Sequence, residues 1–322
     1  GISKFSKVSI FSDLNNLVDV TLDPGQATLF GYTHDEVRKF LPGLLHRFAE
    51  ANGWTDEKGF NEIIRWYDGY RFNAKAERVI NPVSLGRCLM TGELRNYWST
   101  TAMTTFLMDT LKAKPLNFAK VDVDESVLGT YEPDRADFTT LLFQTGYLTI
   151  VGFQQRGAAR RYALDFPNLE VENSFLRQVV PAYTGQETNR ANDIQADAVD
   201  ALYDHEPERF VTALKRLFAN VPYDLTDRQN EQMWQAIAYV VLKMVGVAVL
   251  AEVKTNEGRI DMTAETPEHC YVIEFKLDKS AAEAIRQIKA NRYADKFAGN
   301  GKTLTLVGLA FSKAKRTIVD AA

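Results

Sequence analysis

The sequence predicts an α/β protein, α+β overall, with a mainly helical N-terminal part and a C-terminal part in the order α-β-β-β-α-β. Up to about residue 165, short apolar runs recur at helical spacing and are separated by Gly, Pro and Asn. From about residue 247, runs rich in Val, Ile and Phe alternate with turn residues, which is typical of strands. The 322 residues, 45% of them apolar, suffice for two or three domains of ordinary globular composition.

Charge, cysteine content and hydropathy restrict the partners and the compartment. The net charge is −4, so the chain as a whole has no electrostatic preference for nucleic acid. From Thr226 onward there are 14 Lys and Arg against 12 Asp and Glu, so a phosphate-binding surface is best sought there. Cys88 and Cys270 lie far apart, and no apolar run reaches the ~18 residues of a membrane helix. We therefore expect a cytoplasmic protein without a membrane partner.

The N-terminal part contains one recognisable small unit. Residues 141–150 predict a helix that Gly146 closes, followed by a strand. A second strand is predicted over 161–166, and a helix resumes near Val171. Helix, two short strands and helix is the pattern of a winged-helix-like unit, which we assign to residues 101–180.

Amphipathic helices follow this unit. In residues 207–218 the apolar side chains are spaced by three and four, as on one face of a helix. We interpret residues 181–225 as a helical connector.

The C-terminal elements have clear boundaries. Capping boxes occur at Thr226–Gln229 and at Ser280–Glu283, and a turn signal occurs at 256–258. The predicted elements are a helix over 226–246, strands over 247–254, 259–264 and 270–277, a helix from Ser280, and a strand over 304–311.

Three charged residues on these strands suggest a reactive site. Side chains alternate along a strand, so Glu274 and Lys276 should emerge together on the face opposite the apolar residues, with backbones roughly 7 Å apart. Asp261 lies on the neighbouring strand and should reach the same patch. Two carboxylates form an all-oxygen site suited to Mg2+ or Mn2+, and a neighbouring lysine can assist an attacking water. These parts suit phosphodiester hydrolysis.

The Glu-x-Lys triplet can also be explained without a catalytic function, as exposed charged residues on a strand. Glu-x-Lys is common on solvated strand faces, and Glu252-Val253-Lys254 repeats it on the preceding strand. Only Glu274-Phe275-Lys276 has an aspartate on a hairpin strand 13 residues upstream and a capped helix directly after it. Replacing Asp261, Glu274 or Lys276 by Ala should abolish DNA cleavage and change stability by less than ~1 kcal/mol, because polar site residues are not core packing.

With this context, about the last 100 residues resemble the PD-(D/E)XK nuclease superfamily, which implies a restriction-endonuclease-like domain over 226–322. Asp261 stands at the first metal-binding aspartate of the family, and Glu274-Phe275-Lys276 at its (D/E)-x-K. Glu231 matches a glutamate on the helix before the sheet, and Gln287 a glutamine on the helix after the lysine strand.

The resemblance implies a role for each residue. Asp261 and Glu274 would bind Mg2+ or Mn2+ together with the carbonyl of Phe275, and Lys276 would position or activate the water. Glu231 would be an auxiliary acid, and Gln287 would orient the lysine or a phosphate. Glu252 is either a further acidic ligand or a surface residue. The implied partner is nucleic acid, with DNA expected, and a homo-oligomer is compatible with the sequence.

The N-terminal residues look like part of an AAA-ATPase-like region that precedes such nuclease domains in bacterial proteins. The similar segments are 1–12, 66–70, 81–84 and 97–100. The resemblance assigns residues 1–100 to the C-terminal part of that region, so the chain would start after the phosphate loop. No G-x-x-x-x-G-K-[ST] motif occurs, because Lys296 stands where Gly301-Lys302-Thr303 would need its first glycine. ATP would be a cofactor only of a longer form.

Other interpretations stay open. The nuclease fold could be a catalytically silent binding or regulatory module, or cleavage could be secondary to ATP-driven remodelling of a partner. The aromatic run 66–70 would suit base stacking, although a buried cluster at a helix end is the favoured interpretation. Arg156, Arg160 and Arg161 surround the predicted wing and would suit DNA. The four histidines, His34, His46, His205 and His269, are scattered and give little support to a metal site or a triad.

Overall fold

A computed structural model shows two compact units. One comprises Gly1–Ala102 and Lys120–Phe175, and the other comprises Met103–Ala119 and Leu176–Ala322. The structure describes residues 20–98, 121–125, 128, 138–184, 187–219, 248–254, 259–297, 301–312, 314–315 and 317–322. Among these residues, no helix combines the length and the apolar character needed to cross a bilayer.

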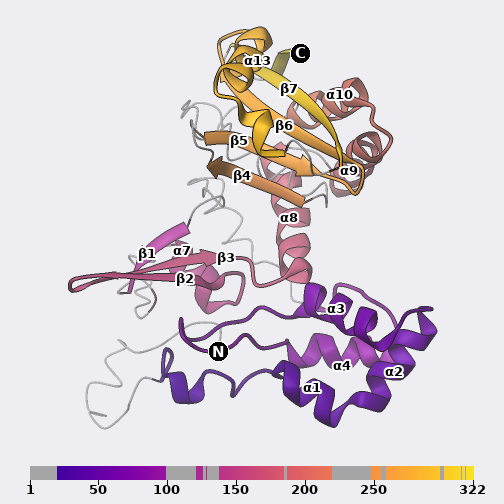
Figure 1. The fold of residues 1–322 in the computed structure, drawn as a ribbon, viewed down its shortest axis with the longest axis vertical. Helices are drawn as coiled ribbons and strands as arrows, with labels where there is room; N and C mark the ends of the chain where they lie inside the picture. The colour runs from indigo at the N-terminus through magenta and orange to yellow at the C-terminus, as the bar shows by residue number, and fades with distance from the viewer. Residues whose placement is uncertain are drawn as a thin grey trace. The chain divides into compact units, whose positions relative to one another are not determined.

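Short capped helices build the first half of the N-terminal unit (Figure 1). After the 3-10 helix η2 (Pro24–Gln26) come α1 (His34–Phe40), α2 (Pro42–Ala51), α3 (Asp56–Tyr67) and α4 (Pro82–Thr91). Side chains of Thr33, Thr55 and Asn81 cap α1, α3 and α4 by accepting backbone N–H groups. The buried faces of these helices meet in one core that includes Phe48, Phe60, Ile63 and Tyr67.

A three-stranded antiparallel sheet completes this unit. Its strands β1 (Val121–Asp124), β2 (Thr149–Arg156) and β3 (Ala159–Asp165) lie in the order β1-β3-β2. Helix α7 (Phe138–Gln144) precedes β2, and α8 (Leu169–Thr184) follows β3.

The predicted helix, two strands and helix are thereby confirmed. Gly146 ends the first helix with a left-handed φ of 82°. Strand β1 was not predicted, because four residues alternating between valine and aspartate are too short to be distinctive.

The C-terminal unit is built on a five-stranded mixed sheet. Strands β6 and β7 are parallel, and all other neighbouring strands are antiparallel. In sheet order the strands are β4 (Ala248–Lys254), β5 (Arg259–Glu265), β6 (His269–Leu277), β7 (Thr303–Ser312) and β8 (Thr317–Ala321). The helices are α9 (Thr188–Tyr203), α10 (Pro207–Phe218), α13 (Ala281–Ala290) and the 3-10 helix η5 (Tyr293–Phe297).

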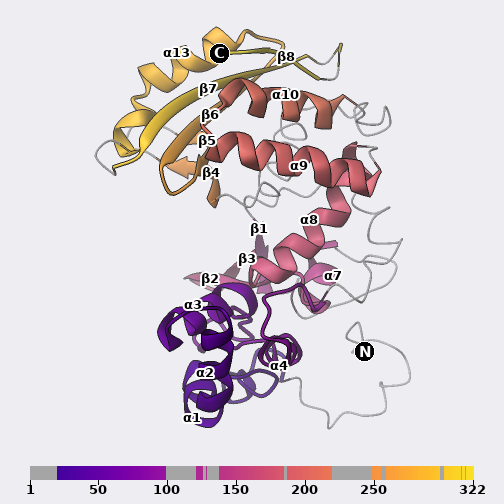
Figure 2. The ribbon, with the colours of Figure 1, turned by 90° about the vertical axis from the view of Figure 1, so that its right-hand side faces the viewer.

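Helices cover both faces of this sheet (Figure 2). On one face, Val272 of β6 packs with Ile288 of α13 in a shared cluster. On the other face, the Tyr271 hydroxyl donates a hydrogen bond to the Leu202 carbonyl of α9, and Phe218 of α10 contacts Phe311 of β7. The described part of the predicted connector 181–225 contains the helices α9 and α10, which pack on the sheet; the domain boundaries stay predictions. These two helices are one layer of this unit.

Most C-terminal elements match their predictions. The hairpin strands β4 and β5, strands β6 and β7, and the capping box of α13 are confirmed. Strand β8 was not predicted and adds an antiparallel edge next to β7. The predicted helix over 226–246 and the turn over 256–258 lie outside the described residues. The AAA-ATPase-like and winged-helix-like assignments stay predictions.

Candidate active site

The pairing of β5 with β6 brings Asp261 next to Glu274. The paired register ends with Met262 opposite Ile273, and one further step places Asp261 across from Glu274. There the Asp261 side chain replaces a strand-to-strand bond, because its Oδ2 accepts the Phe275 backbone N–H at 2.9 Å. The Asp261 carboxylate is thereby held against the backbone of β6, between Glu274 and Lys276.

Glu274 is buried because a helix begins beside it. Its side chain is 1% exposed. On β7 its paired residue is Gly308, where a Cβ atom would lie 2.5 Å from the Ala281 carbonyl oxygen. Only glycine therefore allows the first turn of α13 to approach the sheet this closely. The result is a carboxylate enclosed between strand and helix.

Lys276 partly compensates this buried charge. Its Nζ donates to Glu274 Oε1 and to the carbonyl of Phe275, at 3.1 Å each. The other carboxylate oxygen, Glu274 Oε2, is buried and has no hydrogen-bond partner among the described residues. A buried, unpaired carboxylate oxygen is costly, so the described protein groups leave one binding position at this site unfilled.

The environment makes Glu274 a weak acid. Burial is the largest cause and the charge of Asp261 adds to it, so that the pKa of Glu274 is raised to about 7 although Lys276 opposes the shift. The interpretation as an exposed Glu on a solvated face is therefore wrong for Glu274, because residues 270–275 of the central strand β6 are buried. The expected stability change below ~1 kcal/mol stays a prediction, although Glu274 takes part in a buried ion pair with Lys276.

The oxygen atoms at this site fit a hard divalent cation. Carboxylates of Asp261 and Glu274 and the Phe275 carbonyl lie around the same stretch of β6, and Glu274 Oε2 lacks a partner. Within the described part of the chain, no cluster of three or more His, Cys, Asp or Glu side chains is formed. A cation here would thus rely on two carboxylates, the carbonyl and ligands from solvent or substrate.

Comparison with known proteins agrees with this geometry. Residues 229–321 match the family model of the PD-(D/E)XK nuclease superfamily. These residues form a PD-(D/E)XK nuclease superfamily domain. A curated relative, described as "Uncharacterized protein in vnfD 5'region" from Azotobacter chroococcum mcd 1, is 34% identical over 333 aligned positions. The alignment covers 99% of this chain but only 61% of the relative's length. No solved structure matches.

The remaining predicted residues of the PD-(D/E)XK domain are placed unequally. Glu231 lies outside the described residues. Gln287 is half-buried on α13, and no hydrogen bond joins its amide to Lys276 or Glu274 in the described structure. Their roles stay predictions.

Glu252 holds a more informative backbone position than its sequence context indicated. It lies on β4 between two residues that pair with β5, Ala251 with Met262 and Val253 with Ile260. The register therefore places Glu252 opposite Asp261. In backbone register, three acidic residues therefore occupy one row across β4, β5 and β6, and whether Glu252 is a further ligand or a surface residue stays open.

Two scattered histidines also meet in the C-terminal unit. The rings of His205 and His269 stack with centroids 4.4 Å apart, and His205 Nδ1 lies 3.3 Å from the Tyr271 hydroxyl. Their separation in sequence concealed this pair. Among the described residues, no third His, Cys, Asp or Glu joins the pair in a group that could hold a metal ion.

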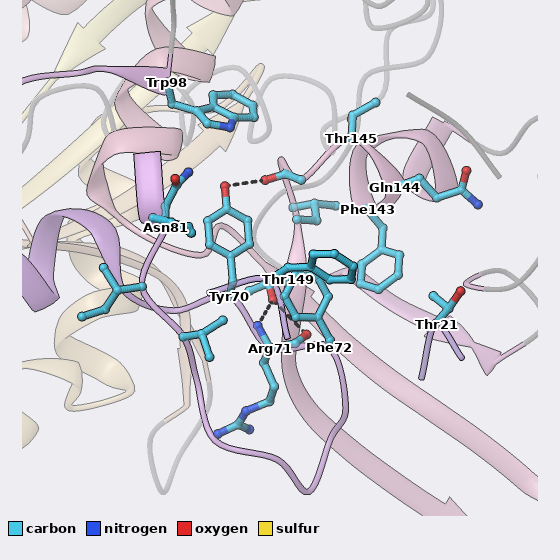
Figure 3. Close-up of a pocket in the computed structure, with 16 residues that line it drawn as sticks. Thr21, Tyr70, Arg71, Phe72, Asn81, Trp98, Phe143, Gln144, Thr145 and Thr149 are labelled. Atoms are coloured by element: carbon cyan, nitrogen blue, oxygen red, sulfur yellow. Dashed lines mark hydrogen bonds between the residues drawn. The ribbon is translucent and has the colours of Figure 1, made fainter. Parts of the chain in front are cut away.

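The N-terminal unit contains a cavity of about 760 Å³ (Figure 3). Tyr70, Phe72, Trp98 and Phe143 contribute aromatic walls. Several polar groups at its edge bond within the protein: the Tyr70 hydroxyl donates to the Gly146 carbonyl, and Thr149 Oγ1 accepts the Arg71 N–H. Among the described residues that line the cavity there is no Asp or Glu, in contrast to the site of Asp261 and Glu274.

The aromatic run 66–70 is mainly a packing element. Tyr67 is fully buried and donates its hydroxyl hydrogen to the Arg95 carbonyl at 2.8 Å. Gly69 has a φ of 124°, and a Cβ atom there would lie 1.8 Å from the Pro167 carbonyl oxygen. This confirms the interpretation as a buried cluster at a helix end.

Two of the three arginines around the predicted wing bind other groups of the N-terminal unit. Arg160 forms an ion pair with Glu125 at 3.2 Å, and Arg161 donates to the Asp122 carbonyl at 3.2 Å. These contacts weaken the case for a DNA-binding wing.

Glu170 of α8 is a second buried acid, in the N-terminal unit. One oxygen accepts the Ser84 hydroxyl at 2.7 Å, and the other accepts the backbone N–H groups of Tyr97 and Trp98 at 2.6 and 2.9 Å. Burial raises the pKa of Glu170, and these three hydrogen bonds oppose the shift. Every oxygen of this carboxylate has a partner, so Glu170 is a structural tie.

Proposed function

We propose that the PD-(D/E)XK domain is a metal-dependent nuclease that hydrolyses phosphodiester bonds of DNA. The observation that carries this proposal is the buried Glu274 beside Asp261 and Lys276, with one carboxylate oxygen left without a partner. A raised pKa next to a charge partner is typical of functional sites. The superfamily match over residues 229–321 supports the same reaction class.

In this proposal Asp261, Glu274 and the Phe275 carbonyl hold Mg2+ or Mn2+. When bound, such an ion would supply Lewis-acid polarisation of a phosphate oxygen and would offset negative charge on the phosphoryl oxygens. Lys276 orients the attacking water and offsets the negative charge that develops as the water oxygen adds and the bond to the sugar oxygen breaks. Glu231 acts as an auxiliary acid, and Gln287 orients Lys276 or a phosphate oxygen.

DNA cleavage by the full chain tests this proposal directly. Linear, circular and single-stranded DNA are incubated with Mg2+, Mn2+ or EDTA, and RNA is included as an alternative substrate. We expect cleavage only with a divalent ion, and a loss of about a thousand-fold in Asp261→Asn.

The matched control is Asp278→Asn. Asp278 is an exposed aspartate just past the end of β6, and its left-handed φ of 54° is one that asparagine also adopts. It should cleave at the wild-type rate. Equal cleavage by wild type and purified Asp261→Asn would refute the assignment.

Manganese binding separates this proposal from a silent nuclease-fold module. An active site should bind Mn2+ in a titration, and Asp261→Asn should abolish that binding. A scaffold that retains only the fold should show no Mn2+ binding that depends on Asp261.

A further inference from the structure

In the described structure, the Lys276 ammonium is bound to oxygens that the proposed function assigns to the metal. Its Nζ lies 3.1 Å from Glu274 Oε1 and 3.1 Å from the Phe275 carbonyl oxygen. The Lys276 side chain is only 15% exposed, and its partner Glu274 is 1% exposed. The positive charge is therefore a component of the buried site and not a side chain extended into solvent.

Two cations cannot use these oxygens together. Mg2+ requires oxygen ligands at about 2.0–2.1 Å, and an ammonium bonded to the same oxygens would lie within a few ångströms of the ion. At such a separation in a poorly hydrated site, like charges repel strongly. The Lys276 ammonium can move away from these oxygens, because it is a compact charge at the end of a flexible four-carbon side chain.

The neighbouring groups indicate where the exchange would occur. Asp261 Oδ2 is held at the Phe275 N–H, so this carboxylate is already in place beside β6. Glu274 Oε2 is buried without a partner, so the ammonium satisfies only one of the two oxygens of Glu274. The ammonium is thus an incomplete substitute for a divalent ion.

We propose that Lys276 occupies the cation position of the metal-free site, and that a divalent ion binds by displacing its ammonium from Glu274 and the Phe275 carbonyl. This inference rests on the proposed function, because it concerns the same site. Lys276 then becomes available to a substrate water only after the exchange. The metal would therefore both complete the site and release the lysine that acts in it.

The first test measures Mn2+ affinity by calorimetry on the full chain at pH 8.5. Lys276→Met keeps most of the side-chain volume and removes the competing charge, so it should bind Mn2+ about ten-fold more tightly than wild type. Lys279→Met removes one positive charge from an exposed residue three positions later and should bind as wild type does. Equal or weaker binding by Lys276→Met overturns the displacement.

The second test follows the lysine itself. Amine acetylation is quantified by mass spectrometry in EDTA and in Ca2+ or Mn2+, without nucleic acid. Lys276 should react several-fold faster with the divalent ion present, while Lys279 should react at one rate in both conditions. Unchanged or slower labelling of Lys276 with the ion overturns the proposal, whatever the stability of the Lys276→Met variant.

The proposed metal site and the proposed displacement of Lys276 can fail separately. If Mn2+ binds wild type but not Asp261→Asn, and Lys276→Met binds no more tightly, the metal site stands and the displacement is wrong. If Mn2+ binding does not depend on Asp261, the proposed function and this inference both fail.

Discussion

Glu170 and Glu274 are both buried glutamates, one in each unit, and they differ in how their oxygens are satisfied. Glu170 is 0% exposed and accepts three hydrogen bonds from neutral donors. Glu274 is 1% exposed, is bonded by one ammonium, and keeps Oε2 without a partner. Burial alone therefore does not distinguish a structural acid from a functional one. What distinguishes them is whether one carboxylate oxygen is left without a hydrogen-bond partner among the described residues.

The largest expected effect is the loss of cleavage in Glu274→Gln. The amide keeps the shape of the carboxylate but cannot hold a divalent ion as well, so the rate should fall about a thousand-fold. Stability at pH 8 should fall by no more than about 1 kcal/mol, because the amide removes a buried charge. Cleavage rates and urea unfolding measure the two quantities. A stable variant that still cleaves would place Glu274 with Glu170 as a structural acid.

For Glu170, in contrast, we expect a substitution to lower the stability of the protein. Glu170→Ala leaves one hydroxyl and two backbone N–H groups without their acceptor, which should cost about 3–5 kcal/mol. Urea unfolding followed by tryptophan fluorescence reports this loss, since Trp54, Trp66 and Trp98 all belong to the N-terminal unit. Glu170→Gln keeps one acceptor and should recover part of the stability. A loss below about 1 kcal/mol would contradict the structural role.

The pH dependence of stability should reveal Glu274 in the metal-free chain. Its folded pKa of about 7 lies above the ordinary 4.5, so the folded state retains its proton more tightly than the unfolded state. The contribution is complete below about pH 4.5 and is lost as the pH rises through about 7.

Urea unfolding in EDTA, followed by hydrogen exchange in β6, measures this effect. Between pH 5 and pH 8, wild type should lose about 2–3 kcal/mol relative to Glu274→Gln. Parallel stability curves for the two proteins would show that the pKa of Glu274 is not raised.

The smallest expected effect comes from a variant in which one Glu170 oxygen loses its hydrogen-bond donor, as in Glu274. Ser84→Ala removes the donor to one Glu170 oxygen and should cost about 1–2 kcal/mol. It should create no Mn2+ site, because the other oxygen still accepts the N–H groups of Tyr97 and Trp98. Calorimetry with Mn2+ checks this, and one additional bound ion would mean that an unpartnered oxygen alone suffices for binding.

The sequence was most informative where local patterns determine geometry. Strand alternation and the hairpin turn predicted that Asp261, Glu274 and Lys276 would lie together, and the structure places them together. Capping boxes located α13, and helical spacing located α10. The catalytic role of these residues stays a prediction, since proximity does not establish a reaction.

Features that depend on distant parts of the chain were missed. The burial of Glu274 requires α13 on its own face of β6, which alternation within one strand does not reveal. Glu170 and its donors are separated by more than 70 residues, and the His205–His269 pair by a similar interval. Strand β8 is a five-residue edge strand whose existence depends on β7 as a template.

Gly308 affects the acidity of Glu274 although it carries no ionisable side chain. A methyl group there would meet the Ala281 carbonyl and the Ala284 side chain, so the start of α13 would have to rise from the sheet. Water would then reach Glu274, its carboxylate would ionise more readily, and its attraction for a cation would be weakened by solvent screening. The acidity of the site is therefore set in part by a missing side chain on the neighbouring strand.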